Sequence, residues 1–211
     1  NFYQELLEKD PIQNTTKVNV TYHNGAMCEI IGNDDYNYNV SFYNNASNEL
    51  IYSSSIKVNQ WTKTLNQNAI RWRVEVTSDN PSFVKYIDVM DLNNKTVNIT
   101  FDSSSLGDTI AWFPYVEEFA LQNKCKVILR TFKNELFNNT DNVILEEIES
   151  ENECYASYNI GVYNDGRHLN DWRNIPLGQI CSDILNIVYS ERKALINENY
   201  LKGQRPLGEK Y

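Results

Sequence analysis

Hydrophobic and polar residues alternate along the first third of the chain, from Lys17 to about Val76. The alternating runs are short and are separated by turn signals, of which Asn24-Gly25 is a strong hairpin signal. The apolar residues of these runs are Val18, Val20, Tyr22, Cys28, Ile30, Ile31, Tyr38, Val40, Phe42, Leu50, Ile51, Tyr52, Ile56, Val58, Ile70, Trp72, Val74 and Val76. Short strands with regular turns predict an antiparallel β sandwich or barrel. We assign this domain to residues 17–78, after a segment 1–16 whose first residues have a helical pattern.

The pattern changes near Asp79-Asn-Pro81. A buried strand is predicted at 97–101, a helix at Asp108 to about Asn123, and a second strand at Cys125–Arg130. A strand, a loop with a glycine, a helix and a strand make one βαβ unit, which implies a parallel sheet with a right-handed crossover.

Further elements of both kinds are predicted after this unit. They are a short helix at Lys133–Phe137, strands near Val143–Ile148 and Tyr158–Val162, a helix from Pro176 to about Tyr189, and its continuation at Glu191–Asn199. We therefore assign 79–211 to a partial, Rossmann-like parallel α/β domain. The predicted fold class is α/β plus all-β.

Composition and charge narrow the range of functions. The chain has 211 residues, a net charge of −9 and a pI of about 4.8. Phosphate contacts need clustered lysines and arginines, so this balance argues against a general nucleic-acid role. The apolar runs are too short to span a membrane.

The four cysteines are far apart, and none belongs to a Cys-x-x-Cys pair. Two disulfides are arithmetically possible, but Cys125 and Cys181 lie in apolar stretches typical of buried positions. We expect free thiols and a reducing, cytoplasmic compartment. Two histidines and scattered cysteines provide no ligand spacing, so we expect no metal site. The chain begins without methionine or a signal peptide and ends in a turn-like run, and we expect a fragment of a longer polypeptide.

The segment 102–115 is the most informative for chemistry. It places Gly107 and Asp108 at the carboxyl end of the first parallel strand, where open α/β sheets bind ligands. The helix N-terminus offers free N–H groups to an anion. Asp108 can act there as a general base, or it can simply cap the helix while Gly107 permits the turn. A single glycine is neither a GxGxxG fingerprint nor a P-loop.

A second candidate segment is the loop 163–177. Its charged and polar residues include Arg167, His168, Asp171 and Arg173. The arginines and the histidine can hold a phosphate or a sugar hydroxyl. The alternative is an ordered surface loop in which Trp172 is an anchor and Arg173 pairs with Asp171.

Aromatic residues of the first domain allow two interpretations. They are Trp61, Trp72, Tyr38 and Phe42. These rings can line a sugar-binding face, but their place in alternating strands favours the core.

Two runs in these segments resemble the autotransporter heptosyltransferase family of bacterial protein O-glycosyltransferases. The first is Leu106-Gly-Asp-Thr-Ile-Ala-Trp-Phe-Pro-Tyr115 with Val116-Glu-Glu-Phe119, and the second is Asp171-Trp-Arg-Asn-Ile-Pro-Leu177 with Gln179 and Ser182-Asp-Ile-Leu185. The Gly-Asp element alone is shared more widely with heptosyltransferases of lipopolysaccharide synthesis. The β region before them also looks like the domain that precedes the catalytic part in that family. The resemblance is strongest at 97–137 and 155–188.

The resemblance implies a GT-B arrangement of two Rossmann-like domains with the active site between them. It implies transfer of a heptose from a nucleotide diphosphate donor to serine hydroxyls of an adhesin, without a catalytic metal ion. The family's Gly-Asp aspartate corresponds to Asp108, the expected base. The donor-binding domain would follow Tyr211, and the family's iron-binding cysteine cluster would lie in it, so none of the four cysteines here inherits that role.

Our first hypothesis is thus the amino-terminal, acceptor-side part of an inverting glycosyltransferase. Asp108 is the expected catalytic residue, and the expected substrate-binding residues are Gly107, Thr109, Arg167, His168 and Arg173. The expected partners are a nucleotide sugar and an acceptor protein or glycan, with no cofactor in this fragment. The alternative is a non-enzymatic module that binds carbohydrate or mediates the assembly of subunits. In the second case the partner would be another copy of the chain, in a homo-oligomer. A dinucleotide-dependent oxidoreductase is weakened by the missing GxGxxG.

Overall fold

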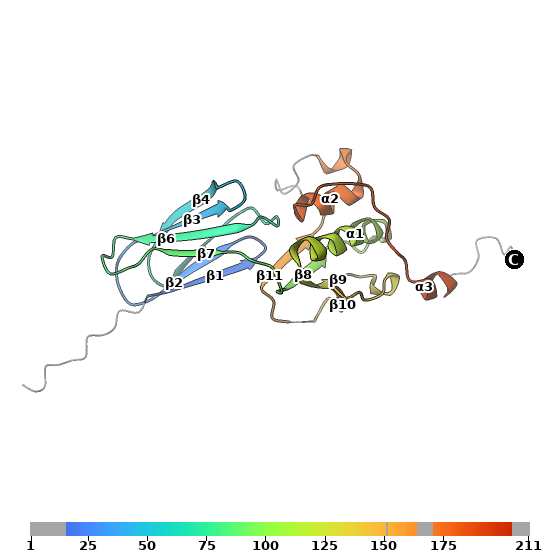
Figure 1. The fold of residues 1–211 in the computed structure, drawn as a ribbon, viewed down its shortest axis with the longest axis horizontal. Helices are drawn as coiled ribbons and strands as arrows, with labels where there is room; N and C mark the ends of the chain where they lie inside the picture. Colours follow the sequence, from blue (N-terminus) through green and yellow to red (C-terminus); the bar gives the residue numbers. More distant parts are fainter. Residues whose placement is uncertain (1–15, 151, 164–170, 204–211) are drawn as a thin grey trace, which may run out of the picture. The chain divides into compact units, whose positions relative to one another are not determined.

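The computed structural model describes residues 16–150, 152–163 and 171–203 (Figure 1). The helical pattern predicted near the N-terminus lies outside these residues. The chain divides into two compact units that exchange short segments. The first unit contains Met27–Thr64, Trp72–Val89 and the chain up to Val20; the second contains Thr21–Ala26, Leu65–Arg71 and the chain from Met90 onward. The boundaries 17–78 and 79–211 stay predictions.

The first unit is built from short strands. They are β1 (Lys17–His23), β2 (Met27–Ile31), β3 (Tyr38–Asn44), β4 (Glu49–Ile56), β5 (Gln60–Lys63), β6 (Trp72–Ser78) and β7 (Tyr86–Val89). Of these, β3 and β6 bury every second residue over most of their length. An antiparallel sheet has the order β4-β3-β6-β7, and β2 lies between β1 and β5. The inward residues of β3 and β6 are fully buried and form much of the core; they are Tyr38, Val40, Phe42, Val74 and Val76. The predicted antiparallel sheet is confirmed.

Two of these strands were not predicted, because their apolar residues face outward. Ile87 and Val89 of β7 are about half exposed, on a strand that pairs only with β6 in the described sheet. In β5 the polar Thr62 is buried and its neighbour Trp61 is exposed. A hydrophobic pattern predicts strands only where the inward residues are the apolar ones.

The second unit contains the parallel strands and the helices. Its elements are β8 (Thr96–Phe101), α1 (Leu106–Asn123), β9 (Lys126–Arg130), β10 (Val143–Glu146), β11 (Ala156–Ile160), α2 (Leu177–Ile184) and α3 (Glu198–Gly203), with 3-10 turns at Asn134–Leu136 and Trp172–Asn174. The parallel order is β10-β9-β8-β11, and the last residues of β1 pair in parallel with β11. The predicted βαβ unit, β8-α1-β9, is confirmed.

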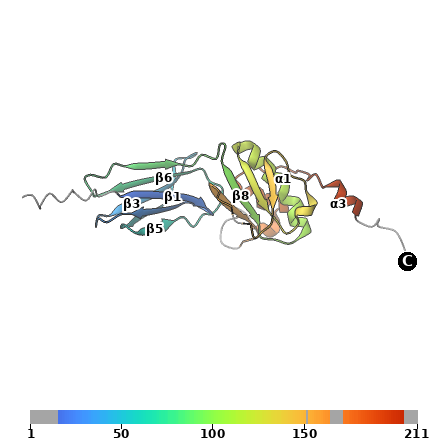
Figure 2. The same ribbon diagram turned by 90° about the horizontal axis from the view of Figure 1, so that it is seen from below.

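Helix α1 covers one face of the parallel strands (Figures 1 and 2). Aromatic side chains make contacts between the helix and these strands. Trp112 meets Phe101 of β8 edge to face, with ring centroids 5.3 Å apart. Phe119 meets Tyr158 of β11 in the same geometry at 5.6 Å. All four rings are fully buried, so these contacts fix the helix over the two central strands. The helix runs through Pro114, which neither starts nor ends it.

The predicted helix from Pro176 to Tyr189 is shorter in the structure, and its continuation at Glu191–Asn199 is wrong. Helix α2 ends at Ile184 because Asn186 takes a left-handed conformation, with φ of 54°. The N–H of Ile187 then donates to the Ser182 carbonyl at 2.8 Å, a bond that closes the helix end. Helical structure resumes only at α3.

Candidate active site

The carboxyl ends of β8 and β11 are joined by hydrogen bonds just beyond the sheet. The Asp102 N–H donates to the Ile160 carbonyl at 2.8 Å, and the Tyr163 hydroxyl donates to Asp102 Oδ2. Gly161 permits this approach, because a Cβ there would lie 2.8 Å from the Tyr163 hydroxyl. The loop between β8 and α1 is therefore tied at its first residue to the loop after β11.

Asp108 lies in the first turn of α1 and is half buried. Its Oδ2 accepts a hydrogen bond of 2.6 Å from the Ser103 hydroxyl. Among the residues that the structure describes, Oδ1 has no hydrogen-bond partner. One oxygen of the carboxylate is thus held by Ser103, and the other is open in the sense that no described residue bonds to it.

The residue that caps α1 is Ser105, which corrects the interpretation of Asp108 as the cap. Helix α1 begins at Leu106, two residues before the predicted start. Ser105 has extended backbone angles, and its hydroxyl accepts the Asp108 N–H at 3.5 Å. Ser105 and Asp108 have the spacing of a capping box, S-x-x-D. The carboxylate of Asp108 is therefore not needed to cap the helix and is bonded to Ser103 instead.

Gly107 and Thr109 flank Asp108 in very different environments. Gly107 is exposed, and a Cβ there would meet only ordinary contacts at 3.8 and 3.9 Å, to Ser105 and Leu177. Neither its backbone nor its neighbours therefore demand glycine in this structure. Thr109 is fully buried, and its hydroxyl donates to the Ser105 carbonyl at 2.9 Å. Its side chain is thus occupied within the helix end, and its predicted role in substrate binding stays a prediction.

Helix α2 packs directly against α1 beside this turn. The Trp112 indole N–H donates to the Leu177 carbonyl at 2.9 Å, and the Cys181 thiol donates to the Trp112 carbonyl at 3.6 Å. A Cβ on Gly178 would lie 2.7 Å from the Tyr115 ring, so glycine is needed there for close packing. These bonds, with Leu177 Cδ1 lying 3.9 Å from where a Cβ on Gly107 would be, place the first residues of α2 beside α1.

Arg173 lies four residues before Leu177, in a 3-10 turn capped by Asp171. Its guanidinium is 3.4 Å from Asp171 Oδ1 and stacks over Trp172 with 5.0 Å to the ring centroid. The side chain is 62% exposed. These contacts match the surface-loop interpretation. Arg167 and His168 lie outside the described residues.

Arg130, at the carboxyl end of β9, is the buried cation of this sheet edge. Its Nη2 is 3.7 Å from Glu146 at the end of β10, and the side chain is 9% exposed. The Arg130 guanidinium is thus buried and paired with Glu146. From the sequence, only exposed cations were considered for phosphate binding, so Arg130 was not singled out.

The cysteines are four unpaired thiols, and three are buried. Burial raises the pKa of Cys28 and of Cys125 to about 12, and it raises the pKa of Cys181 as well. These thiols are poor nucleophiles at neutral pH because the thiolate is the reactive form. No group of three or more metal-binding side chains occurs within the described residues. None of the helices described there is long and apolar enough to cross a membrane.

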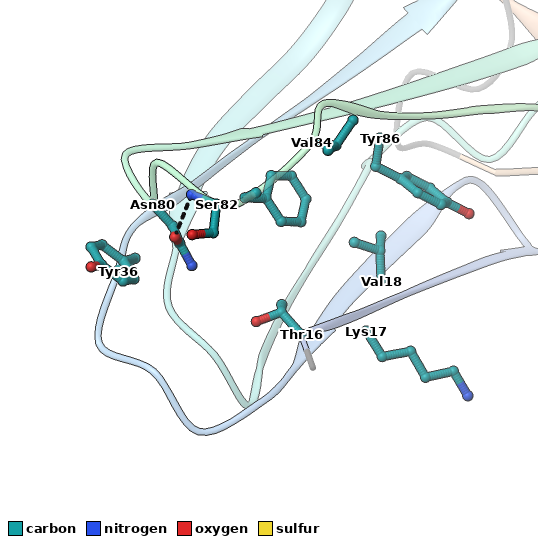
Figure 3. A pocket seen from close by; sticks show the side chains of 9 residues that line it. Thr16, Lys17, Val18, Tyr36, Asn80, Ser82, Val84 and Tyr86 are labelled. Carbon is teal, nitrogen blue, oxygen red and sulfur yellow. Dashed lines mark hydrogen bonds between the residues drawn. The ribbon is translucent and has the colours of Figure 1, made fainter. Parts of the chain in front are cut away.

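A separate cavity of about 630 Å³ lies in the first unit (Figure 3). Its lining combines aromatic and polar side chains from Thr16, Lys17, Val18, Tyr36, Asn80, Ser82, Phe83, Val84 and Tyr86. Of the four aromatics considered for a sugar-binding face, Trp72, Tyr38 and Phe42 are core residues, whereas Trp61 is exposed. The rings that line the cavity are Tyr36 and Phe83, which lie in loops, and Tyr86, which begins β7; they were missed because loop residues carry no periodic signal and β7 itself was not predicted.

Sequence reasoning also missed Asp102, Ser103 and Tyr163. The S-x-x-D spacing of Ser105 and Asp108 was a readable signal for the helix start. The bond between Ser103 and Asp108 has no such signal, because it depends on how the loop folds back over the first turn.

Comparison with known proteins places these features in context. No known family model matches the sequence. The chain is 25% identical to autotransporter heptosyltransferase Aah of Escherichia coli over 182 residues, 82% of this chain and 46% of that protein. It is 24% identical to autotransporter heptosyltransferase BAHTCr of Citrobacter rodentium over 66% of this chain and 36% of that protein.

Solved structures show the same fold. The chain matches the bacterial iron-containing dodecameric glycosyltransferase TibC of enterotoxigenic E. coli with a TM-score of 0.72 and 19% identity, over 85% of this chain and 48% of TibC. The complex of TibC with ADP-D-beta-D-heptose matches with a TM-score of 0.76 and 18% identity, over 95% of this chain and 54% of that one.

The chain spans about half the length of the relatives that it matches. Within that half, both resembling runs lie in the second unit, on α1 and on the segment that leads into α2. Named relatives and a shared fold cover most of the sequence. The resemblance of this chain to the autotransporter heptosyltransferases is therefore confirmed.

Proposed function

We propose that this chain is the acceptor-side part of an inverting glycosyltransferase. The enzyme transfers a heptose-like sugar from a nucleotide diphosphate donor to the hydroxyl of a protein serine. The observation that carries the proposal is the Asp108 carboxylate at the carboxyl edge of the parallel strands, with Oδ2 held by Ser103 and Oδ1 open. Relatives named heptosyltransferases, and ADP-heptose bound in the TibC complex, support the sugar and the donor.

The proposed reaction is a direct displacement at the anomeric carbon. The acceptor oxygen attacks this carbon as its proton passes to Asp108 Oδ1. The bond between the anomeric carbon and the diphosphate oxygen breaks, and its electron pair leaves with the nucleotide diphosphate. A carboxylate serves as base only within hydrogen-bond reach of the attacking hydroxyl. Asp108 Oδ1, which has no partner among the described residues, is the oxygen left to make that bond.

The neighbouring helix ends provide local stabilisation for the leaving diphosphate. Helices α1 and α2 are joined by the bonds of Trp112 with Leu177 and with Cys181, and the first turn of each helix carries partial positive charge on free N–H groups. Because Gly107 has no side chain, a ligand can approach the α1 backbone closely there. This role would account for a glycine at a helical position, where glycine is about 1 kcal/mol less favourable than alanine. Arg173 is the nearby exposed cation that adds to this charge. A net charge of −9 makes such local contacts necessary, because it disfavours long-range attraction of an anionic donor.

Three finer parts of the proposal concern the whole protein. A GT-B arrangement requires a second, donor-binding domain, and the relatives are about twice as long as this chain. Assembly into a homo-oligomer is supported by the dodecameric TibC. A cytoplasmic location is supported by four unpaired cysteines, since reducing compartments keep thiols free.

The decisive test is Asp108→Asn in the complete natural protein that contains this chain. Asparagine keeps the shape of aspartate but cannot accept the proton, so transfer from ADP-heptose to acceptor protein should fall by about 10²–10⁴-fold. Thermal unfolding should change little, because Ser105 supplies the cap. Donor binding, measured by calorimetry, should persist.

Asp108→Ala is the matched comparison. It loses the bond from Ser103 and the favourable charge at the helix start, so stability should fall by about 0.3–1 kcal/mol along with the rate. Wild-type transfer by Asp108→Asn would show that the residue has only a structural role.

A second candidate function is carbohydrate binding without transfer, and the cavity in the first unit favours it. The exposed ring of Tyr36 and the ring of Tyr86 provide apolar faces, and Asn80 and Ser82 provide polar groups beside them, as Figure 3 shows. A protein that binds sugars but turns over none of a panel of nucleotide sugars would favour this function over transfer.

A further inference from the structure

We propose that Ser103 is a positioning residue that fixes the Asp108 carboxylate for proton transfer. The inference rests on the proposed function, because it assumes that Asp108 is the base. It adds a residue to which neither the motifs nor the comparisons assign a role.

The Ser103 hydroxyl has two hydrogen-bond partners, one that donates to it and one that accepts from it. It accepts the Ser105 N–H at 3.1 Å, and it donates to Asp108 Oδ2 at 2.6 Å. A hydroxyl has one proton, so acceptance from Ser105 directs that proton to the carboxylate. Hydrogen bonds to an ionised acceptor are short and strong, and 2.6 Å lies in the range typical of O–H donors to carboxylates.

This arrangement differs from an ordinary capping box. There the carboxylate at the third helical position accepts the N–H of the cap residue directly. Here the Ser105 N–H donates to the Ser103 hydroxyl instead, and that hydroxyl donates a hydrogen bond to Asp108. The helix end is satisfied without the carboxylate, so the bond from Ser103 serves to orient Asp108, with Oδ2 held and Oδ1 without a partner among the described residues.

The two serines next to Ser103 can serve as controls for a test of the positioning role. Ser104 is exposed and makes no side-chain hydrogen bond within the described residues, whereas Ser105 is the helix cap. Three adjacent positions with the same side chain thus provide one test residue, one inert control and one structural control.

The experiment measures kcat and KM for heptose transfer by the complete natural protein. Ser103→Ala should lower kcat by about 10- to 100-fold, the loss expected for a hydrogen bond to a charged group. The KM values for donor and acceptor should stay within about twofold, because positioning acts on the chemical step. Ser103→Thr keeps the hydroxyl and should restore most of kcat, whereas Ser104→Ala should match wild type. If Ser103→Ala does not fold, Ser103→Cys keeps the size with a weak donor and should show the same loss.

A double-mutant cycle isolates the contact itself. In the Asp108→Asn background, Ser103→Ala should cause no further loss of kcat, because the base is already absent. Wild-type kcat in Ser103→Ala, an equal loss in Ser104→Ala, or an independent loss in the double variant would each overturn the positioning role. If Asp108→Asn is inactive while Ser103→Ala is normal, only this inference fails; if Asp108→Asn is fully active, the proposed function fails as well.

Discussion

The environment of Asp108 is set by hydrogen bonds to residues three and five positions earlier in the chain. Its backbone N–H is capped by Ser105, and its carboxylate is bonded to Ser103, so the same residue takes part in helix initiation and presents an open oxygen. Separate partners for the backbone and the side chain are what allow a first-turn aspartate to take part in the helix start and also to serve as the base that we propose.

At this scale, Ser105→Ala should lower the free energy of unfolding by about 1 kcal/mol, because the alanine cannot accept the orphan N–H of Asp108. Urea unfolding of the protein measures the change. Ser105→Asp keeps an acceptor and should retain most of the stability, and Ser104→Ala should have no effect. Equal stability of Ser105→Ala and wild type would show that the 3.5 Å bond contributes nothing.

At the scale of elements, α1 is defined by its two ends and by its aromatic face. Ser105 starts it, and Lys124 ends it in a left-handed conformation with φ of 50°. The Lys124 N–H donates to Leu121 at 3.2 Å, and the Cys125 N–H donates to Ala120 at 3.0 Å. Glycine is the usual residue at such a position, since a side chain there is strained.

Lys124→Gly should therefore stabilise the protein, by up to about 1 kcal/mol, because glycine relieves the left-handed strain at this helix end. Thermal unfolding should show a rise in Tm of a few degrees. Lys126→Gly is the matched control: Lys126 lies in β9 with extended backbone, and glycine there should destabilise. A lower Tm for Lys124→Gly would mean that the lysine side chain contributes more than the strain costs.

At the scale of the whole molecule, both units bury thiols in their cores. Cys28 lies in the first unit and Cys125 in the second, and the pKa of each is raised to about 12 by burial. The folded state thus keeps both thiols protonated at pH values where the unfolded chain loses the protons.

This difference predicts loss of stability at alkaline pH. Where the unfolded state binds fewer protons than the folded state, stability falls as pH rises. The window opens near the ordinary thiol pKa of about 9 and closes near 12. Within it, each thiol should contribute a slope of about 1.4 kcal/mol per pH unit. Urea unfolding at pH 9.5 and 10.5 measures the slope, and Cys125→Ala should reduce it by about that amount. Equal slopes for the two proteins would contradict the linkage.

Some features of this protein are determined by its sequence alone. Alternation in Tyr38–Phe42 and Trp72–Val76 predicts strands because a sheet buries every second residue, and the buried run at Val97–Phe101 followed by a helical pattern predicts a βαβ unit. The candidate base was found in the same way, since Gly107-Asp108 follows a strand and opens a helix. These signals are local, and local geometry decides them.

Other features depend on residues that the chain brings together only on folding. The open oxygen of Asp108 results from the return of Ser103 over the first turn, and the tie between β8 and β11 joins Asp102 to Tyr163 across 61 residues. The end of α2 is set by a left-handed Asn186, and β7 is held by its pairing with β6 although its apolar residues face outward. The tie of Asp102 to Tyr163 and the pairing of β7 are non-local, so no period or spacing reports them. The Ser103 bond spans only five residues, but it depends on how an irregular loop folds, so only the three-dimensional structure decides which oxygen of Asp108 is held.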